Sequence, residues 1–199
     1  PIEDNQSVEL EKGPNIKSLP HNEPLLDKYK VPVLLKMGDN ISTDEILKAG
    51  AEVLPYRSNL PEISKYSFIV VDESFYDRAL KAKDQFGGHV VVAAENYAQG
   101  SSREHAALAP KYLGQKAVLA KSYARIAWQN LVNFGILPLE FIDKDDYDRI
   151  EQGDEIELEN AADQVKNGSE VEVKLVKKDG QEHKILTKHS MSDRQIQVL

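Results

Sequence analysis

Four short apolar runs along the middle of the chain constrain the fold more than any other feature of the sequence. They are Val33–Met37, His89–Ala94, Ala117–Ala120 and Ile136–Phe141. Each has the length of a buried strand, and the segments between the last three show turn residues and the apolar periodicity of helices. Strands that alternate with helices in this way build the sheet of an α/β domain.

Helices are predicted on either side of these strands. An amphipathic helix is predicted over Phe75–Lys83, and the apolar segment Tyr66–Val71 before it reads as a further strand. A second helix is predicted over Ser101–Pro110, since proline cannot continue a helical hydrogen-bond ladder. A third is predicted to begin at Ser122, a suitable N-cap, and to end near Phe134.

The two ends of the chain differ from its middle. Residues 1–30 hold four of the nine prolines among polar residues and are predicted to form an extended linker arm. Residues 31–199 are predicted to form the folded domain. After residue 150 the sequence becomes β-like over Glu155–Glu159, Glu170–Val176 and Gln181–Leu186, with an Asp-Gly pair that predicts a hairpin between the last two.

The composition excludes several classes of function. The 199 residues hold 25 Lys and Arg against 33 Asp and Glu, a net charge of −8 that repels nucleic-acid phosphates. Cysteine is absent, so the chain can form no disulfide and no thiolate-ligated iron–sulfur cluster of its own. Apolar runs fall short of the roughly 20 residues that span a membrane. The acidic N-terminus is unlike a secretory signal, and a cytoplasmic location is predicted.

The segment Glu95–His105 carries the most chemistry, at a predicted junction from strand to loop to helix. Ser101, Ser102 and Arg103 stand where the N–H groups of a helix start favour an anion, and a guanidinium matches a carboxylate in two-point contact. A serine hydroxyl among such donors can also be stabilised as an alkoxide and act as a base. A structural interpretation stands beside this one, because Ser101 and Glu104 have the spacing of a capping box.

Other polar segments say less when each is taken alone. Gly38–Ile46 is an ordinary Asx-rich turn, and Leu54–Leu60 is an ordinary loop with one surface arginine, Arg57. The five histidines are scattered, with no pair at the helical spacing of metal ligands, so no metal site is predicted. A structural role is the better interpretation for each of them except His105.

Taken together and in order, these segments resemble the C-terminal swivel domain of aconitate hydratases of the single-chain bacterial type, in the aconitase and isopropylmalate isomerase superfamily. The similarity covers most of residues 31–142 and is most specific in Gly100–His105 and Lys121–Ile126. It extends to Gly38–Gly50 and Gly135–Leu139. The resemblance implies an α/β fold, a swivelling β/β/α three-layer domain with a β-rich C-terminal part.

The resemblance also implies an activity. Enzymes of this family isomerise citrate and isocitrate through cis-aconitate, by dehydration and rehydration. Ser101 matches the serine whose alkoxide removes and returns the proton, and Asp44 matches an active-site aspartate. Glu45 stands where the family pattern has histidine, which puts the local hydrogen bonding in question. The residues that match binders of the substrate are Arg57, Ser102, Arg103 and Thr43.

The cofactor and the partners follow from the same resemblance. The family uses a four-iron iron–sulfur cluster held by cysteines of other domains, and none is expected on this chain. The expected partners are cluster-bearing core domains, in the same polypeptide or in a separate subunit, and a tricarboxylate substrate. Neither nucleic acid nor membrane is expected as a partner. The chain alone is therefore expected to be inactive, as half of an active site.

Two alternatives stay open. The small subunit of isopropylmalate isomerase or homoaconitase shares the swivel fold, but Arg57 favours citrate and isocitrate, because those relatives tend to lack an arginine there. The proline-rich arm favours an excised domain over a small subunit. A non-catalytic module that binds carboxylates or a partner protein is the second alternative, and the presence of Ser101, Arg103 and Arg57 speaks against it.

Overall fold

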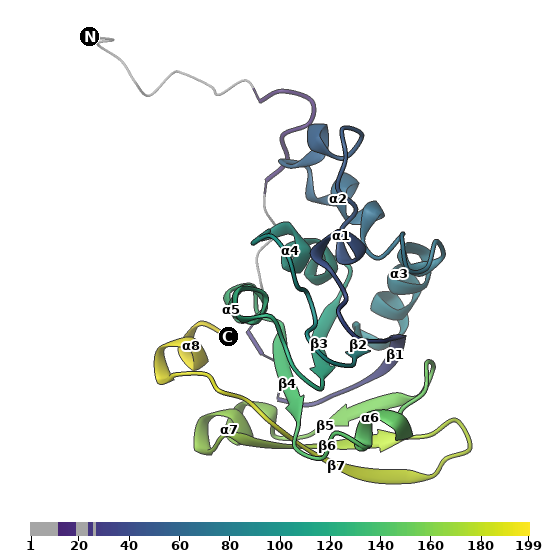
Figure 1. Cartoon of the computed structure of the whole chain (residues 1–199), viewed down its shortest axis with the longest axis vertical. Helices are drawn as coiled ribbons and strands as arrows, with labels where there is room; N and C mark the ends of the chain where they lie inside the picture. Colours follow the sequence, from purple (N-terminus) through teal and green to yellow (C-terminus); the bar gives the residue numbers. More distant parts are fainter. Residues whose placement is uncertain (1–11, 19–23, 26) are drawn as a thin grey trace.

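The computed structural model describes residues 12–18, 24–25 and 27–199, so most of the predicted arm lies outside the described residues. Seven strands close into a barrel in the order β1-β2-β3-β4-β7-β6-β5 (Figure 1). One half of this barrel is parallel and the other is antiparallel. The two halves are joined at both edges, since β1 pairs with β5 and β4 pairs with β7.

The parallel half consists of the four strands that the apolar runs predict. They are β1 (Tyr29–Met37), β2 (His89–Ala93), β3 (Gln115–Ala120) and β4 (Leu137–Phe141). Neighbouring strands pair in parallel, with Val91 opposite Val118 and Leu119 opposite Leu139. Strand β1 begins at Tyr29, earlier than predicted, because its first residues pair with the antiparallel half.

The antiparallel half confirms the prediction of a β-rich C-terminal part. It consists of β5 (Glu155–Leu158), β6 (Glu170–Val176) and β7 (Glu182–Lys188). Buried and exposed residues alternate along β6, the pattern of a strand with one face on a core. The predicted turn at Asp179 and Gly180 joins β6 to β7.

Helices cover the outer face of the parallel half. The long ones are α3 (Phe75–Phe86), α4 (His105–Tyr112) and α5 (Arg125–Asn133). Short ones lie in the connections: α1 (Thr43–Ile46), η2 (Leu54–Tyr56), α2 (Leu60–Ile63), η3 (Ser64–Tyr66), α6 (Asp146–Arg149), α7 (Ala161–Asn167) and α8 (Asp193–Val198).

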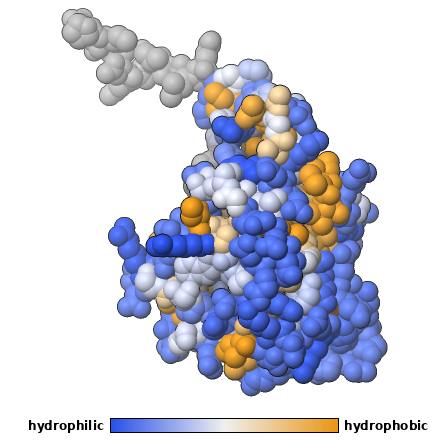
Figure 2. Space-filling model, in the orientation of Figure 1, coloured by the Kyte–Doolittle hydropathy of each residue, from blue (hydrophilic) through white to orange (hydrophobic). Residues whose placement is uncertain are grey.

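Two apolar cores result from this arrangement. One fills the barrel interior, and the other lies between the parallel half and its helices. The layers are thus antiparallel strands, parallel strands and helices, but the two β layers form one closed sheet, which the three-layer prediction did not include. Hydrophilic side chains cover most of the face seen in Figure 2.

Two predicted elements are wrong for reasons of backbone conformation. Tyr66–Val71 is not a strand: it forms turns around Phe68, whose φ of 54° is incompatible with a strand. Phe68 itself is buried, and Val70 and Val71 beyond it are exposed. Pro110 does not end α4 but lies inside it, and the helix runs two residues further, to Tyr112.

Two predicted helix starts are also corrected. Helix α4 begins at His105 rather than Ser101, and no side chain caps it, so the capping box of Ser101 and Glu104 does not form. Helix α5 begins at Arg125 rather than Ser122. The Ser122 hydroxyl serves the neighbouring loop instead, where it accepts a hydrogen bond from the Asn96 N–H at 2.8 Å.

Candidate active site

The Ser101 segment lies where parallel strands end. It follows β2, and the loop after β1 lies against it through two backbone hydrogen bonds. The Thr43 N–H donates to the Gln99 carbonyl at 2.9 Å, and the Gln99 N–H donates to the Ile41 carbonyl at 3.0 Å. The carboxyl ends of parallel strands are where α/β sheets commonly bind ligands. The two segments that the sequence singled out are therefore in direct contact.

Side-chain amides reinforce this junction. The Asn96 Nδ2 donates to Asn40 Oδ1 at 3.0 Å and to Gln99 Oε1 at 3.1 Å. Gly100 follows with a φ of 113°, and a Cβ there would lie 3.2 Å from Thr43 Oγ1. The positive φ favours glycine at this position, and a Cβ would also be in tight contact with Thr43. The loop that presents Ser101 is fixed from both sides.

Arg103 is the centre of the site. Its Nε donates to Ser101 Oγ at 3.1 Å, and its other nitrogens donate to Thr43 Oγ1 at 2.8 Å, to the Leu47 carbonyl at 3.3 Å and to Asp44 Oδ1 at 2.6 Å. The guanidinium is half-buried, whereas the Asp44 side chain is largely exposed. A fork held by this many partners presents its charge in one orientation.

Ser101 is exposed and lies directly beside this cation. A neighbouring positive charge favours the ionised form of an acidic group, so a guanidinium in this position can stabilise negative charge on the Ser101 oxygen. Ser102 is also exposed, next to it in the loop. The structure therefore brings together Ser101, Ser102, Arg103, Thr43 and Asp44, as the resemblance implies.

Glu45, the departure from the family pattern, has a local role. Its carboxylate accepts hydrogen bonds from the Ser42 N–H and from the Ser42 hydroxyl, both at 2.8 Å, and the Glu45 N–H donates back to Ser42 Oγ at 3.2 Å. This is a capping box at the start of α1. Glu45 thus fixes the helix that carries Thr43 and Asp44.

Arg57 and Arg103 both line a hollow on the surface of the domain. The hollow has a volume of about 280 Å³, and both arginines line it together with Ser102 and His105. Among the described residues no acidic side chain pairs with the exposed Arg57 guanidinium. Two cations that face one hollow can grip two carboxylates, or one carboxylate from two sides.

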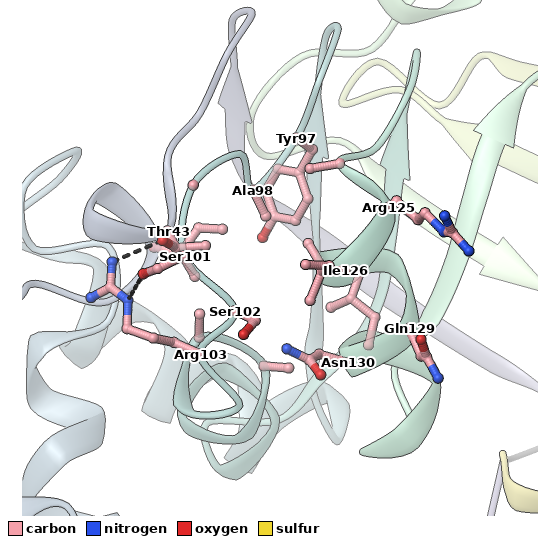
Figure 3. Close-up of a pocket in the computed structure, with 17 residues that line it drawn as sticks. Thr43, Tyr97, Ala98, Ser101, Ser102, Arg103, Arg125, Ile126, Gln129 and Asn130 are labelled. Carbon is pink, nitrogen blue, oxygen red and sulfur yellow. Dashed lines mark hydrogen bonds between the residues drawn. The ribbon is translucent and has the colours of Figure 1, made fainter.

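A larger cleft of about 520 Å³ lies on the other side of the Ser101 loop (Figure 3). Ser101 and Ser102 form one wall, and helix α5 forms the opposite wall. Figure 3 shows the Asn130 side chain directed toward Ser102, whereas Arg125 points away. The residues of α5 that line the cleft are Arg125, Ile126, Ala127, Gln129, Asn130 and Leu131.

The wall formed by α5 was not predicted from the sequence. The specific match over Lys121–Ile126 was the signal that could have found its first residues, but no ligand-binding role was assigned to them. Tyr97 also lines this cleft, and its hydroxyl is buried near the side chain of Gln115. Burial raises the pKa of that hydroxyl well above its ordinary value, so Tyr97 is neutral and can donate a proton in a hydrogen bond.

Charged groups brace the base of the Ser101 loop. Glu95 accepts hydrogen bonds from the Lys144 ammonium and the Ser122 hydroxyl, both at 2.5 Å. These two bonds hold the pKa of the Glu95 carboxyl below its ordinary value. Glu95 is thus ionised at neutral pH and acts as an anchor rather than as a proton donor.

The residues of this chain do not fit an iron–sulfur cluster. The sequence has no cysteine to ligate one. In the part of the chain that the structure describes, no three His, Asp or Glu side chains gather as a metal site.

None of the helices among the described residues is long and apolar enough to cross a membrane.

Known proteins match this chain along most of its length. It is 40% identical over 96% of its length to a putative mitochondrial aconitate hydratase of Emericella nidulans, and 36% identical over 96% to a mitochondrial homocitrate dehydratase of Saccharomyces cerevisiae. The match covers 27% of each of these proteins, so the chain spans about a quarter of the length of the curated relatives it matches.

A solved structure and a family model agree with these relatives. The crystal structure of 3-isopropylmalate dehydratase from Methanocaldococcus jannaschii is similar with a TM-score of 0.60 and 30% identity, over 82% of this chain and 84% of that chain. The model of the aconitase C-terminal domain matches residues 28–144, more than half of the chain. This protein therefore belongs to the aconitase C-terminal domain family.

Proposed function

We propose that this chain supplies the base and the carboxylate clamps of a hydro-lyase site that interconverts citrate and isocitrate through cis-aconitate. The observation that carries the proposal is the constellation around Arg103, which holds Ser101 and Asp44 together. Arg57 lines the smaller hollow together with Arg103 and Ser102. A tricarboxylate needs several cationic contacts, and these two arginines provide them on a chain whose net charge is −8.

The proposed chemistry begins at Ser101. Its alkoxide takes a proton from the carbon next to a substrate carboxylate, and becomes a neutral hydroxyl. The electron pair of the broken C–H bond forms the double bond of cis-aconitate while the hydroxyl on the adjacent carbon leaves with its bonding electrons. Rehydration reverses these steps, and Ser101 returns the proton. Negative charge that develops on the carboxylate is stabilised by Arg103.

Asp44 and Thr43 act through Arg103 in this proposal. Asp44 and Thr43 both accept hydrogen bonds from one terminal nitrogen of the Arg103 guanidinium, Nη2. Neither partner blocks Nε, which faces Ser101. Asp44 is thus assigned to the orientation of Arg103 rather than to proton transfer. Ser102, exposed between the two hollows, is assigned to a substrate carboxylate.

Activation of the leaving hydroxyl has to come from outside this chain. The family resemblance assigns it to an iron–sulfur cluster on core domains, which acts as a Lewis acid toward that hydroxyl when bound. We propose such a core as the partner, in the same polypeptide or in a second one. Residues 31–199, together with Tyr29 and Lys30 of β1, would form the mobile domain, and the residues before Tyr29 would form the linker to that core. A cytoplasmic location remains our prediction, although relatives of this chain are named as mitochondrial.

A dehydratase for isopropylmalate or homocitrate is the second candidate. The similar solved structure and one of the relatives are named for these activities. Arg57 favours citrate over isopropylmalate, because an alkyl group in place of a carboxylate would leave a guanidinium without its anion. Homocitrate keeps the three carboxylates and differs in length.

Reconstitution tests the proposal. The chain is mixed under anaerobic conditions with a cluster-bearing aconitase core that lacks its own C-terminal domain, and binding is verified by gel filtration. Turnover of citrate, isocitrate, homocitrate and isopropylmalate is then measured for the mixture, for the core alone and for the chain alone. Turnover of citrate and isocitrate by the mixture only is expected.

Other outcomes have distinct meanings. Preferential turnover of isopropylmalate or homocitrate would assign the second candidate. A docked but inactive mixture would contradict both and would favour a non-catalytic module, which should bind tricarboxylates tightly by itself and raise its melting temperature accordingly.

A further inference from the structure

We propose that His105 is a positioning residue that fixes Arg57 for binding of the distal carboxylate, an inference that rests on the proposed function. The His105 Nε2 lies 2.8 Å from the backbone carbonyl oxygen of Arg57. A carbonyl only accepts hydrogen bonds, so Nε2 carries the proton and donates it. His105 is the first residue of α4 and comes two residues after Arg103.

The loop of Arg57 is held on either side of this residue, since the Asn59 N–H donates to the Tyr56 carbonyl and the Lys17 N–H donates to the Ser58 carbonyl, both at 2.8 Å. It consists of a short 3₁₀ turn, and the bond that closes this turn, from the Arg57 N–H to the Leu54 carbonyl, is long at 3.4 Å. Leu54 is 53% exposed, so it anchors the loop weakly. Beyond Arg57, buried Asn59 caps α2 through the Glu62 N–H at 3.3 Å. The hydrogen bond from His105 holds the backbone of Arg57 itself, which lies between the 3₁₀ turn and the start of α2.

Helix α4 provides a rigid support for the imidazole. Ala106 and Ala107, which follow His105, are buried in the core between the helices and the sheet. The same helix start is attached to Arg103, whose guanidinium is held by Asp44 and Thr43. His105 therefore sets the separation of the two arginines across their shared hollow.

Other roles fit His105 less well. Its Nε2 is already engaged with a carbonyl, which leaves that nitrogen unable to accept a proton from substrate. Among the described residues it belongs to no cluster of possible metal ligands. Arg57 is proposed to bind a carboxylate remote from the reacting carbon, so a less well fixed Arg57 would weaken ground-state and transition-state binding alike and raise KM.

A double-mutant cycle in the reconstituted complex tests this role, with whichever hydroxy acid the complex turns over. His105→Leu removes the donor, and His105→Gln keeps an amide N–H that can reach the carbonyl. We expect His105→Leu to raise KM about 10-fold with kcat nearly unchanged, and His105→Gln to restore KM to within about threefold of wild type. In an Arg57→Ala background, His105→Leu should change KM by less than about twofold. His183→Leu, on β7, is the matched control.

The contrary outcomes are equally clear. An additional KM effect in the Arg57→Ala background, an equal loss with His105→Leu and His105→Gln, or a loss confined to kcat would overturn the assignment. Amide hydrogen exchange of residues 54–60 in the chain alone is a readout that needs no substrate. His105→Leu should accelerate this exchange, and His105→Gln should not. If the complex turns over no substrate, the proposed function fails, and unchanged exchange would then overturn the role of His105 as well.

Discussion

The two halves of the barrel share an interior core, but they use their strand ends differently. In the antiparallel half, β6 returns directly into β7 through a turn closed by the Lys177 N–H to the Gln181 carbonyl at 2.8 Å. Charges on these strands pair with one another: Lys174 of β6 pairs with Glu157 of β5 at 3.5 Å and with Glu182 of β7 at 3.6 Å. The charged side chains of this half are thus engaged across the strand surface rather than gathered at the strand ends.

The parallel half cannot return directly, since parallel strands need crossover connections. Its strands β1 and β2 end at one edge, and the loops that follow bring Thr43 and Ser101 together there. These loops therefore expose the hydroxyls of Ser101 and Ser102 and the guanidinium of Arg57 at this edge. The candidate site thus lies in the crossovers of the parallel half, whereas the antiparallel half contributes its buried side chains to the barrel core.

The largest expected effect on stability comes from a cavity in the antiparallel half. Leu175 is fully buried in the barrel interior. Leu175→Ala should lower the free energy of unfolding by about 3 kcal/mol and the melting temperature by about 10 °C. Urea unfolding and thermal melts measure both, with Leu186→Ala, at a position 36% exposed, as the control. Turnover per folded molecule in the reconstituted complex should stay unchanged. A loss of turnover beyond the loss of folded protein would contradict the assignment of the site to the parallel half.

The next effect is on activity, from the parallel half. Arg103→Lys keeps the charge but cannot hold Ser101, Thr43 and Asp44 at once, because an ammonium lacks the planar fork. We expect kcat/KM of the reconstituted complex to fall about 100-fold with a nearly unchanged melting temperature. Arg149→Lys, in α6, is the matched control and should retain full activity. Equal activity of the two variants would contradict the proposed role of Arg103.

A smaller effect on stability is expected from the opposite edge of the parallel half, where the parallel strands begin. His89 opens β2, is fully buried, and has a pKa that burial lowers to about 3. Unfolded chains bind a proton at His89 below about pH 6.5 and folded chains do not, so stability is lost as the pH falls from about 6.5 toward 3. Acidification from pH 7 to 5 should cost about 2 kcal/mol through this residue.

His89→Leu should remove that part of the pH dependence. Urea unfolding of wild type and variant at pH 7 and pH 5 measures it as a difference of differences. An equal loss of stability on acidification in both proteins would show that His89 does not control the acid sensitivity of this edge.

The smallest effect is expected from Asp44→Asn. The amide keeps an acceptor for Arg103 but removes the negative charge, so we expect kcat/KM to fall about 10-fold. Asp179→Asn, in the turn of the antiparallel half, is the control. A loss as large as that of a general base, about 1,000-fold, would instead assign Asp44 to proton transfer.

The sequence predicts the parallel half well because its strands are buried and apolar, and local patterns reveal them. Closure of the barrel was not predictable, since it depends on long-range pairs such as Tyr29 with Leu158 and Phe141 with Thr187. The false strand at Tyr66–Val71 shows the limit of apolar runs. Phe68 adopts a positive φ there, and Val70 remains exposed.

The candidate site was predictable as a set of residues, through family resemblance, but not as a geometry. Ser101 with Glu104 had the pattern of a capping box, yet Ser101 Oγ is engaged by Arg103, because α4 starts only at His105. The resemblance pointed to Asp44, but the sequence did not reveal that Asp44 pairs with Arg103. The hydrogen bond from His105 to Arg57 joins residues 48 positions apart, and no local pattern encodes it.

Proton abstraction by Ser101 can be tested by comparing two reconstituted complexes. Formation of cis-aconitate from citrate and isocitrate is measured for the reconstituted complex with wild-type chain and with the Ser101→Ala chain. We predict that kcat falls about 1,000-fold or more with intact docking and a nearly unchanged KM. A Ser101→Ala complex that keeps more than about a tenth of the wild-type kcat would contradict the claim.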